Sequence, residues 1–186
     1  MKNITLKPHS LTYADRIFTL TSAPEVTDAL GLQVETVDDT IDFLQAVMAE
    51  ETSGRTVSRA IFNEQDELIG ITTLLFIDQK KQSCTLGTWI GHEYRGQSYN
   101  IASKYAILQI AFAELKLERV FIGARLANKR SQHAPKKLPF ITWHVEADYP
   151  DVHEAIEAKE QQPCLLNVVY RADFLLNRTG VSNKTL

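Results

Sequence analysis

The chain has 186 residues, which suits one domain with a full hydrophobic core and excludes two ordinary domains. Apolar residues make up 44% and charged residues 23%, which excludes a disordered composition. The net charge of −3 at pH 7 excludes a global positive field that would draw the protein to nucleic acid or anionic membranes.

The N-terminal part of the chain predicts a short strand followed by helices. Alternating residues over Ile4–Pro8 predict a strand that ends at its proline. A hydroxyl residue three positions before an acidic residue is a helix-start signal, and it occurs three times here. The pairs are Thr12 with Asp15, Ser22 with Glu25, and Thr36 with Asp39. They predict helices over Asp15–Thr21, over Pro24–Leu30, and from Thr36 to about Glu51.

The hydrophobic period then changes from helical to alternating. Three strand-like runs, separated by short polar turns, predict a meander. These runs are Val57–Phe62, Leu68–Ile77 and Ser83–Ile90. Apolar residues at helical spacing predict a long helix over Ile101–Leu117, and Arg119–Leu126 predicts the strand that follows it. A strand, a crossover helix and a second strand predict two parallel strands with a right-handed connection.

The C-terminal part predicts smaller elements. They are a short helix over Ser131–Lys137, a strand over Phe140–Ala147, an acidic helix over Pro150–Gln161, a strand over Cys164–Tyr170 and a polar tail over Asn177–Leu186. Pro135 and Pro139 predict that the short helix is short, displaced or kinked and ends without a glycine, because proline breaks helical hydrogen bonding beyond the first turn. We therefore expect one α/β domain over residues 1–176 and a tail over residues 177–186.

The cysteines and the apolar runs predict a soluble cytoplasmic protein. Cys84 and Cys164 are too few for a disulfide framework and are not spaced as a metal site. Met1–Asn3 does not open a signal peptide, and no apolar run approaches the roughly 20 residues of a membrane span. We expect no metal, no membrane and no nucleic acid among its partners.

The connection before the long helix reads Tyr94-Arg95-Gly96-Gln97-Ser98-Tyr99-Asn100-Ile101-Ala102. A loop that leads into a helix presents backbone N–H groups and the positive end of the helix dipole to an anion. By itself this is a weak signal for a phosphate loop. The alternative is a surface loop in which Ser98 caps the helix.

Five short motifs follow one another along residues 4 to 145. They are Leu6-Lys7-Pro8, Asp66-Glu67-Leu68-Ile69-Gly70, Gly87-Thr88-Trp89-Ile90, Arg95-Gly96-Gln97-Ser98-Tyr99-Asn100, and Asn128 with Ser131 ahead of Phe140. In this order the chain resembles the GNAT family of acetyl-CoA-dependent N-acetyltransferases, most closely the branch that acetylates the N-termini of ribosomal proteins. The resemblance implies a GNAT fold: a central mixed sheet of about seven strands, mostly antiparallel, with helices on both faces.

The resemblance also implies a reaction and a cofactor site. The protein would bind acetyl-CoA and transfer its acetyl group to a primary amine by direct attack. The cofactor-binding residues would be Trp89, Ile90, Arg95, Gly96, Gln97, Ser98, Tyr99, Asn100 and Asn128. In the family's loop pattern, R/Q-x-x-G-x-G/A, Ser98 and Asn100 replace small residues. The strand ending at Trp89 and Ile90 would bulge away from Arg119–Leu126, pair with pantetheine and stabilise the oxyanion through a backbone N–H.

The catalytic acid and base are assigned by the same resemblance. Many family members protonate the thiolate with a tyrosine where this chain has Pro135, which has no donor. The branch that the chain most resembles is thought to use the serine at the position of Ser131, so the resemblance makes Ser131 our candidate acid; the alternative is that Ser131 caps the short helix. The strand over Ser83–Leu86 lacks the glutamate that the family often uses as a base. We take Glu93 as the candidate base. Three histidines stay open alternatives: His92, His133 and His144.

Two charged segments each have a structural and a functional interpretation. Lys129, Arg130, Lys136 and Lys137 form either a solvated helix face or cations near coenzyme A. The acidic residues of segment 146–160 either face solvent or attract a cationic acceptor.

The expected partner is an amine-bearing small molecule or a peptide N-terminus, and a homodimer is the family's default. The departures at Ser98, Asn100, Pro135 and Pro139 favour an alternative function, a GNAT-fold protein that binds acyl-CoA or a partner without catalysis.

Overall fold

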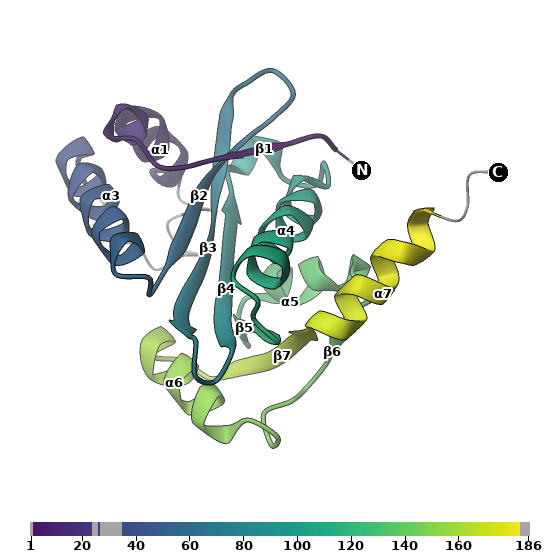
Figure 1. The fold of residues 1–186 in the computed structure, drawn as a ribbon. Coiled ribbons are helices and arrows are strands. Elements are labelled where there is room, and N and C mark those ends of the chain that lie inside the picture. The colour runs from purple at the N-terminus through teal and green to yellow at the C-terminus, as the bar shows by residue number, and fades with distance from the viewer. Residues whose placement is uncertain (1, 24–25, 27–34, 183–186) are drawn as a thin grey trace. The chain divides into compact units, whose positions relative to one another are not determined.

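The fold, taken from a computed structural model, is described here for residues 2–23, 26 and 35–182 (Figure 1). The chain divides into two compact units. The first is Met1–Ile77 with Gly87–Leu108, and the second is Asp78–Leu86 with Gln109–Leu186. A seven-stranded sheet has the order β1-β2-β3-β4-β5-β7-β6, which confirms the mixed α/β class and the expected number of strands. Within the described ranges, no helix is long and apolar enough to cross a membrane.

The predicted N-terminal strand and meander are confirmed. The strands are β1 (Thr5–Lys7), β2 (Val57–Phe62), β3 (Leu68–Asp78) and β4 (Ser83–Ile90). β1 pairs antiparallel with β2, and β2 pairs antiparallel with β3. The ladder between β2 and β3 shifts its register at the end of β2, at Ile61 and Phe62.

The helices and helical turns of the first unit include the two predicted over Asp15–Thr21 and from Thr36 to about Glu51. They are η1 (Leu11–Tyr13), α1 (Ala14–Thr21), α3 (Val37–Thr52), the 3-10 turn η2 (His92–Tyr94) and α4 (Tyr99–Gln109). Thr36 and Asp39 form a complete capping box, as predicted. The start signal at Thr12 was wrong, because Ser10 accepts the hydrogen bond from the Thr12 N–H and opens η1 instead. The predicted helix over Pro24–Leu30 lies, apart from Val26, outside the described residues.

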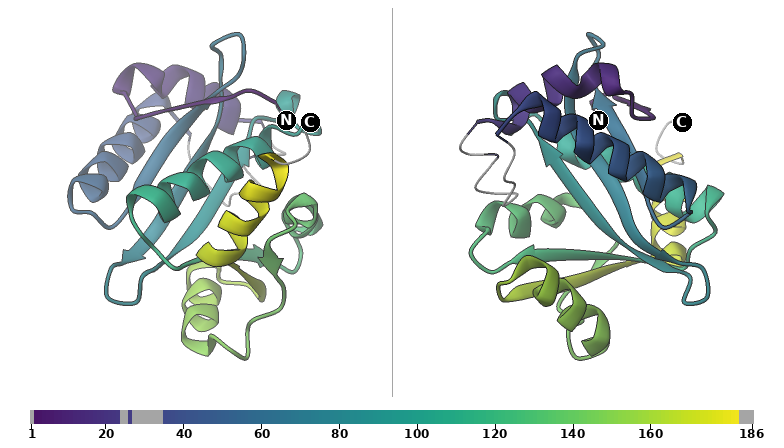
Figure 2. Two further views of the ribbon diagram at one scale, coloured as in Figure 1. Left: turned by 45° about the vertical axis from the view of Figure 1, so that its right-hand side comes forward. Right: turned by 90° about the vertical axis from the view of Figure 1, so that its left-hand side faces the viewer.

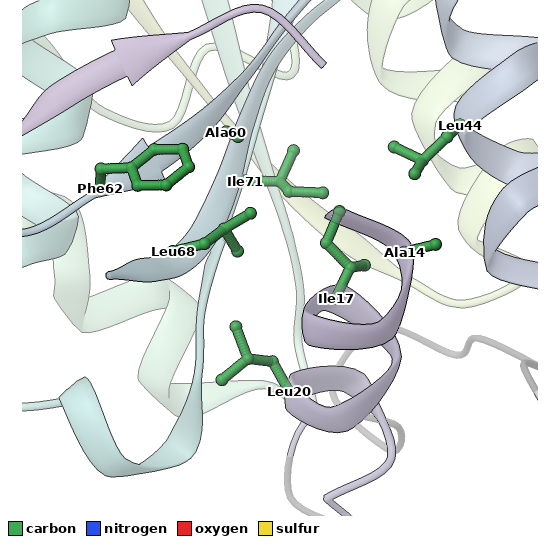
Figure 3. Close-up of a cluster of buried hydrophobic side chains, with 8 residues drawn as sticks. All are labelled: Ala14, Ile17, Leu20, Leu44, Ala60, Phe62, Leu68 and Ile71. Carbon is green, nitrogen blue, oxygen red and sulfur yellow. The ribbon is translucent and has the colours of Figure 1, made fainter. Parts of the chain in front are cut away.

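Alternate residues of the strands divide the first unit into two cores. One core joins α1 and α3 to β2 and β3, and Figure 3 shows Ile17 and Leu20 of α1 on the side of the strands and Ala14 on the side of Leu44. Its buried members are Ala14, Ile17, Leu20, Leu44, Ala60, Phe62, Leu68 and Ile71. The other core contains Ile61, Ile69, Ile90 and Tyr99, so α4 covers the opposite face from α1 and α3. Figure 2 shows α1 and α3 lying side by side over their face.

The second unit contains the strand that follows the long helix and the C-terminal elements. They are the π-helical turn η3 (Ile110–Glu114), β5 (Arg119–Arg125), α5 (Lys129–His133), the 3-10 turn η4 (Ala134–Lys137), β6 (Ile141–Thr142), α6 (Pro150–Glu160), β7 (Cys164–Tyr170) and α7 (Arg171–Ser182). β4 pairs parallel with β5, which confirms the predicted parallel unit. β5 and β6 both pair antiparallel with β7, and Ile156 of α6 packs on this part of the sheet.

Two C-terminal predictions were wrong. The strand over Phe140–Ala147 is reduced to the two residues of β6, because His144 has a left-handed backbone with φ of 58° that ends the extended run. The segment from Asn177, expected in a polar tail, continues α7 up to Ser182. Phe174 anchors that helix, since its ring packs against Phe112 and Phe140 at centroid distances of 5.3 and 5.2 Å.

Candidate active site

The end of β4 is pressed against β3 at Gly70. A Cβ atom on Gly70 would lie 2.2 Å from the Trp89 carbonyl oxygen and 3.0 Å from the Ile90 Cα. No side chain fits at that distance, so the glycine fixes how closely the two strands approach. The Gly91 N–H then donates to the Ile69 carbonyl at 2.8 Å and closes the ladder. The glycine of the Asp66–Gly70 motif therefore sets the position of the main chain at Trp89 and Ile90.

The side chain of Trp89 has a structural role of its own. It is partly buried and packs against the core shared by α1 and α3. Ile90 points to the other face, where it is buried beside Tyr99. Successive side chains point to opposite faces of the sheet, and here both pack in cores. A catalytic role for this strand end would therefore fall to its main chain.

The loop after β4 is held in shape by its own side chains. Arg95 Nε donates to the Ile90 carbonyl at 3.2 Å, which ties the loop to the strand end. Gln97 Nε2 donates to the Glu93 carbonyl at 3.1 Å. Both long polar side chains are therefore used, at least in part, to fold the loop back on η2.

Two residues of the loop have left-handed backbones. Gly96 has φ of 76°, and Ser98 has φ of 69°. A Cβ atom on Gly96 would meet nothing within 4 Å, so conformation alone requires glycine there. Ser98 adopts this conformation against the preference of an L-residue. An N-cap residue normally has an extended backbone, so Ser98 departs from the ordinary cap that we kept as the alternative.

α4 begins directly after this loop. The first helical hydrogen bond runs from the Ala102 N–H to the Ser98 carbonyl at 3.1 Å. The amides of Tyr99, Asn100 and Ile101 precede it and belong to the helix turn that has no internal acceptors. Together with the left-handed residues, they form a cluster of main-chain donors of the kind that binds phosphate.

Asn100 does not project freely from the loop. Its Oδ1 accepts a hydrogen bond from Lys104 Nζ at 2.6 Å, one helical turn further on. Lys104 is 5% exposed, and burial lowers the pKa of its ammonium from 10.5 to about 8. The asparagine thus supplies the polar partner that a buried lysine requires. Lys104 was not predicted from the sequence; its signal was a lysine four residues after Asn100 inside an otherwise apolar helix.

Tyr99 and Glu93 are both engaged with neighbouring side chains. Tyr99 is buried, and its hydroxyl donates to Glu64 Oε2 at 2.8 Å. Glu93 Oε1 accepts from Arg16 Nη2 at 3.2 Å, and the same nitrogen lies 2.8 Å from the Tyr94 hydroxyl. Arg16 therefore connects α1 to the turn η2, which carries our candidate base.

Asn128 and Ser131 belong to the second unit. Asn128 is the N-cap of α5, because its Oδ1 accepts from the Ser131 N–H at 3.0 Å. The alternative in which Ser131 caps the helix was wrong: Ser131 supplies the capped N–H, and its side chain is exposed. The hydroxyl that we assigned as an acid is therefore not the cap of this helix.

The prolines shorten α5 as predicted. The α-helix lasts five residues and changes at Ala134 to the 3-10 turn η4, where Pro135 stands in the first turn. Leu138, before Pro139, has φ of −102° and ψ of 116°, an extended conformation that ends the helix without a glycine. The side chains of the four cations of this segment extend from an exposed surface.

Three acidic residues of segment 146–160 have structural partners. Glu160 accepts from Arg125 Nε, Glu157 from the Cys164 N–H at 2.9 Å, and Glu146 from the Leu166 N–H at 2.8 Å. These contacts attach α6 and the segment before it to β5 and β7. We expected, as the structural interpretation, that these acidic residues face solvent. These three carboxylates instead make contacts within the second unit.

The parallel ladder between β4 and β5 is short. Its three pairs are Ser83 with Arg119, Cys84 with Val120, and Thr85 with Phe121. β5 goes on pairing with β7 as far as Arg125. Within the second unit, pairing between β4 and β5 thus ends after Thr85. Among the described residues no group of three or more histidine, cysteine or acidic side chains could hold a metal ion.

Comparison with known proteins identifies a domain family. Residues 3–141 match the family model described as an acetyltransferase (GNAT) domain. Over 74 residues the chain is 32% identical to the Bacillus subtilis (strain 168) protein named "Putative ribosomal N-acetyltransferase YdaF". That alignment spans 40% of this chain and 40% of the relative.

Solved structures share the fold at low sequence identity. The spermidine N-acetyltransferase from Vibrio cholerae in complex with CoA and spermine aligns with a TM-score of 0.72 and 13% identity, covering 92% of this chain and 98% of that chain. The microcin C7 self-immunity acetyltransferase MccE in complex with acetyl-CoA and AMP aligns with a TM-score of 0.68 and 18% identity. It covers 75% of this chain and 79% of its own.

Proposed function

Because this chain belongs to the acetyltransferase (GNAT) domain family, we propose that it transfers the acetyl group of acetyl-CoA to a primary amine. The observation that carries the proposal is the connection from β4 to α4. A strand end fixed against Gly70 leads into a loop with left-handed residues and then into the free amides of a helix N-terminus. Such an arrangement suits a pyrophosphate group close to the main chain.

Within this proposal the main chain supplies most of the chemistry. The amides around the start of α4 would hold the pyrophosphate, and a backbone N–H near Trp89 or Ile90 would stabilise the oxyanion that forms on attack. Arg95 would hold the loop in position through its bond to the Ile90 carbonyl. Ser98 and Asn100 keep their backbone N–H groups, so replacing small residues there removes no main-chain donor.

Side chains would move the protons. We propose Ser131 as the acid that protonates the departing thiolate, because its exposed hydroxyl is not the α5 cap. We keep Glu93 as a candidate base for the amine, three residues beyond the end of β4. Asn128, proposed from the sequence as a cofactor-binding residue, would act by fixing the first turn of α5.

The names of the relatives support an amine as the acceptor. The names of the matched proteins mention spermidine, spermine and ribosomal N-acetyltransferase activity, all of which concern amines. We therefore propose an amine-bearing small molecule or a peptide N-terminus as acceptor. We further propose a cytoplasmic protein, on the ground that both cysteines are free and buried, and a homodimer, which light scattering after gel filtration would detect.

A second candidate function is acyl-CoA binding without transfer. Pro135 favours it, because proline has no donor where the family commonly has a tyrosine acid. The test uses two steps. A rise in melting temperature with acetyl-CoA would support cofactor binding, and release of free thiol with spermidine or with a peptide bearing a free N-terminal serine would support transfer. Binding with no thiol release above the rate of buffer would favour the binder, and no binding would contradict both.

A further inference from the structure

His9, Ser58 and Thr73 form a series of hydrogen-bonded side chains in the first unit, which runs from buried His9 to Thr73 on β3. His9 Nε2 lies 2.8 Å from Ser58 Oγ, which in turn lies 2.7 Å from Thr73 Oγ1. Ser58 is 0% exposed and His9 is 8% exposed, whereas Thr73 is half-buried. The series therefore has a buried imidazole at one end and a hydroxyl within reach of solvent at the other.

Two contacts show in which register β3 and β4 are paired. These strands are consecutive, neighbours in the sheet and joined by a short turn, so they run antiparallel. The hydroxyls of Thr72 and Thr88 lie 2.8 Å apart, and the Gly91 N–H donates to the Ile69 carbonyl at 2.8 Å. Both contacts belong to one and the same antiparallel register.

In that register Thr73 lies opposite Gly87. Side chains alternate along a strand, so Thr73 is on the face away from the Thr72 and Thr88 hydroxyls. Gly87 has no side chain, so β4 places no side chain beside Thr73 at this position, and Thr73 is half-buried. Trp89, two residues further along β4, lies on the same face and packs on the core of α1 and α3. The outer end of the series thus lies beside the strand end proposed to stabilise the oxyanion.

The imidazole of His9 has one ring nitrogen without a hydrogen-bond partner in the described part of the chain and lies near two charged side chains. Its Nδ1 is buried and has no hydrogen-bond partner among the described residues. Burial lowers the pKa of His9, while the nearby charges act in opposite directions: Glu51 of α3 raises it and Arg59 of β2 lowers it. Those two charges form an ion pair with each other. His9 is therefore neutral at pH 7 and can accept a proton on Nε2.

We propose that Thr73, Ser58 and His9 form a proton relay that serves the acceptor amine, an inference that rests on the proposed function. As the amine nitrogen bonds to the acetyl carbon, its proton passes to Thr73 Oγ1. The Thr73 proton passes to Ser58 Oγ, and the Ser58 proton passes to His9 Nε2. The C–S bond then breaks, and the thiolate leaves with its electron pair and takes a proton from the acid, assigned above to Ser131. The proton on His9 returns to solvent along the same route after the amide has left, and the exposed Ser131 regains its proton from solvent.

The relay is tested by the pH profile of kcat in four variants. The wild-type rate should fall on the acid side below pH 6.5, the ordinary value for histidine, because a charged His9 accepts no proton. Thr73→Val and His9→Gln should each lower kcat at pH 7 by about 100-fold, the lower range for a general base, and should lose this acid limb. Thr73→Ser keeps the hydroxyl and should keep most of the rate. Thr72→Val removes a hydroxyl pair on the other face and should leave kcat unchanged.

Acetyl-CoA affinity and melting temperature of Thr73→Val should match those of Thr72→Val, which excludes misfolding as the cause of a lower rate. A wild-type protein that turns over spermidine or the serine peptide, with Thr73→Val equally fast, would overturn the relay alone. An acid limb that survives in His9→Gln but disappears in Glu93→Gln would also overturn it. A wild-type protein that binds acetyl-CoA but releases no thiol with either amine would overturn the proposed function and the relay together.

Discussion

Lys104 Nζ donates to Asn100 Oδ1 over 2.6 Å, so the asparagine that replaces a small residue of the family loop is oriented along α4. The ammonium is buried, and its pKa falls from 10.5 to about 8. A charged group in such a site costs stability, and here a single side-chain amide oxygen offsets part of the cost. Because Asn100 belongs to the proposed phosphate loop, Lys104 holds the side chain of a loop residue in place.

Lys104→Met should therefore stabilise the protein and weaken acetyl-CoA binding. The lowered pKa means that the unfolded chain holds its proton between pH 8 and 10.5 while the folded chain releases it. The penalty is complete below pH 8 and disappears as the pH rises to 10.5. Removing the ammonium should raise the free energy of unfolding at pH 7 by on the order of 2 kcal/mol, measured by urea denaturation. Lys80→Met, at an exposed lysine, should have no such effect.

Gly70→Ala should destabilise the end of β4. The added Cβ would approach the Trp89 carbonyl to 2.2 Å, a main-chain contact that only a shift of the strand can relieve. We expect a loss of about 3 kcal/mol in unfolding free energy and a large fall in acetyl transfer. Gly87→Ala is the stability control, since its nearest neighbour would be the Leu75 Cδ1 at 3.8 Å. Equal stability of the two variants would contradict the close approach.

Ser98→Gly should relieve backbone strain in the loop. A φ of 69° is strained for serine and not for glycine, so the variant should gain about 1 kcal/mol in unfolding free energy. Ser98→Ala tests the cause, because alanine has the same penalty and should bring no gain. If both variants change stability equally, the hydroxyl and not the backbone conformation is responsible.

Substitutions at Asn128 and Ser131 should have different effects: the first should lower stability, and the second should lower kcat. Asn128→Ala removes the cap of α5 and should cost about 1 kcal/mol. Ser131→Ala keeps the N–H that is capped, so stability and acetyl-CoA affinity should stay unchanged while kcat falls at least tenfold. An unchanged kcat in Ser131→Ala would remove Ser131 from the mechanism.

The strands and the parallel unit were predictable because local patterns and tertiary packing agree there. Alternation over residues 57–90 corresponds to β2, β3 and β4, and the capping box at Thr36 starts α3. The C-terminal errors arose where tertiary contacts override local pattern. The polar residues from Asn177 onward suggest a tail, but α7 continues to Ser182. Phe174 anchors this helix, because its ring packs against two aromatic rings distant in sequence.

The site was predictable as a motif but not as a set of contacts. The glycine of the Asp66–Gly70 motif was visible, whereas the Trp89 carbonyl that excludes a side chain there depends on the pairing of β3 with β4. The contact between His9 and Ser58 joins residues 49 positions apart, beyond the reach of any periodicity. The i to i+4 contact between Asn100 and Lys104 could have been found, since both residues share a helix.

Acetyl-CoA binding to the connection between β4 and α4 is the central claim, and a thermal-shift titration tests it most directly. At acetyl-CoA about 100-fold above its Kd, a ligand that binds only the folded protein adds about 2.7 kcal/mol, which corresponds to a rise of about 5 to 10 °C in Tm for a domain of this size. Gly96→Val, strained at a left-handed position, should show a much smaller rise. A Tm that does not move at millimolar acetyl-CoA would contradict the account.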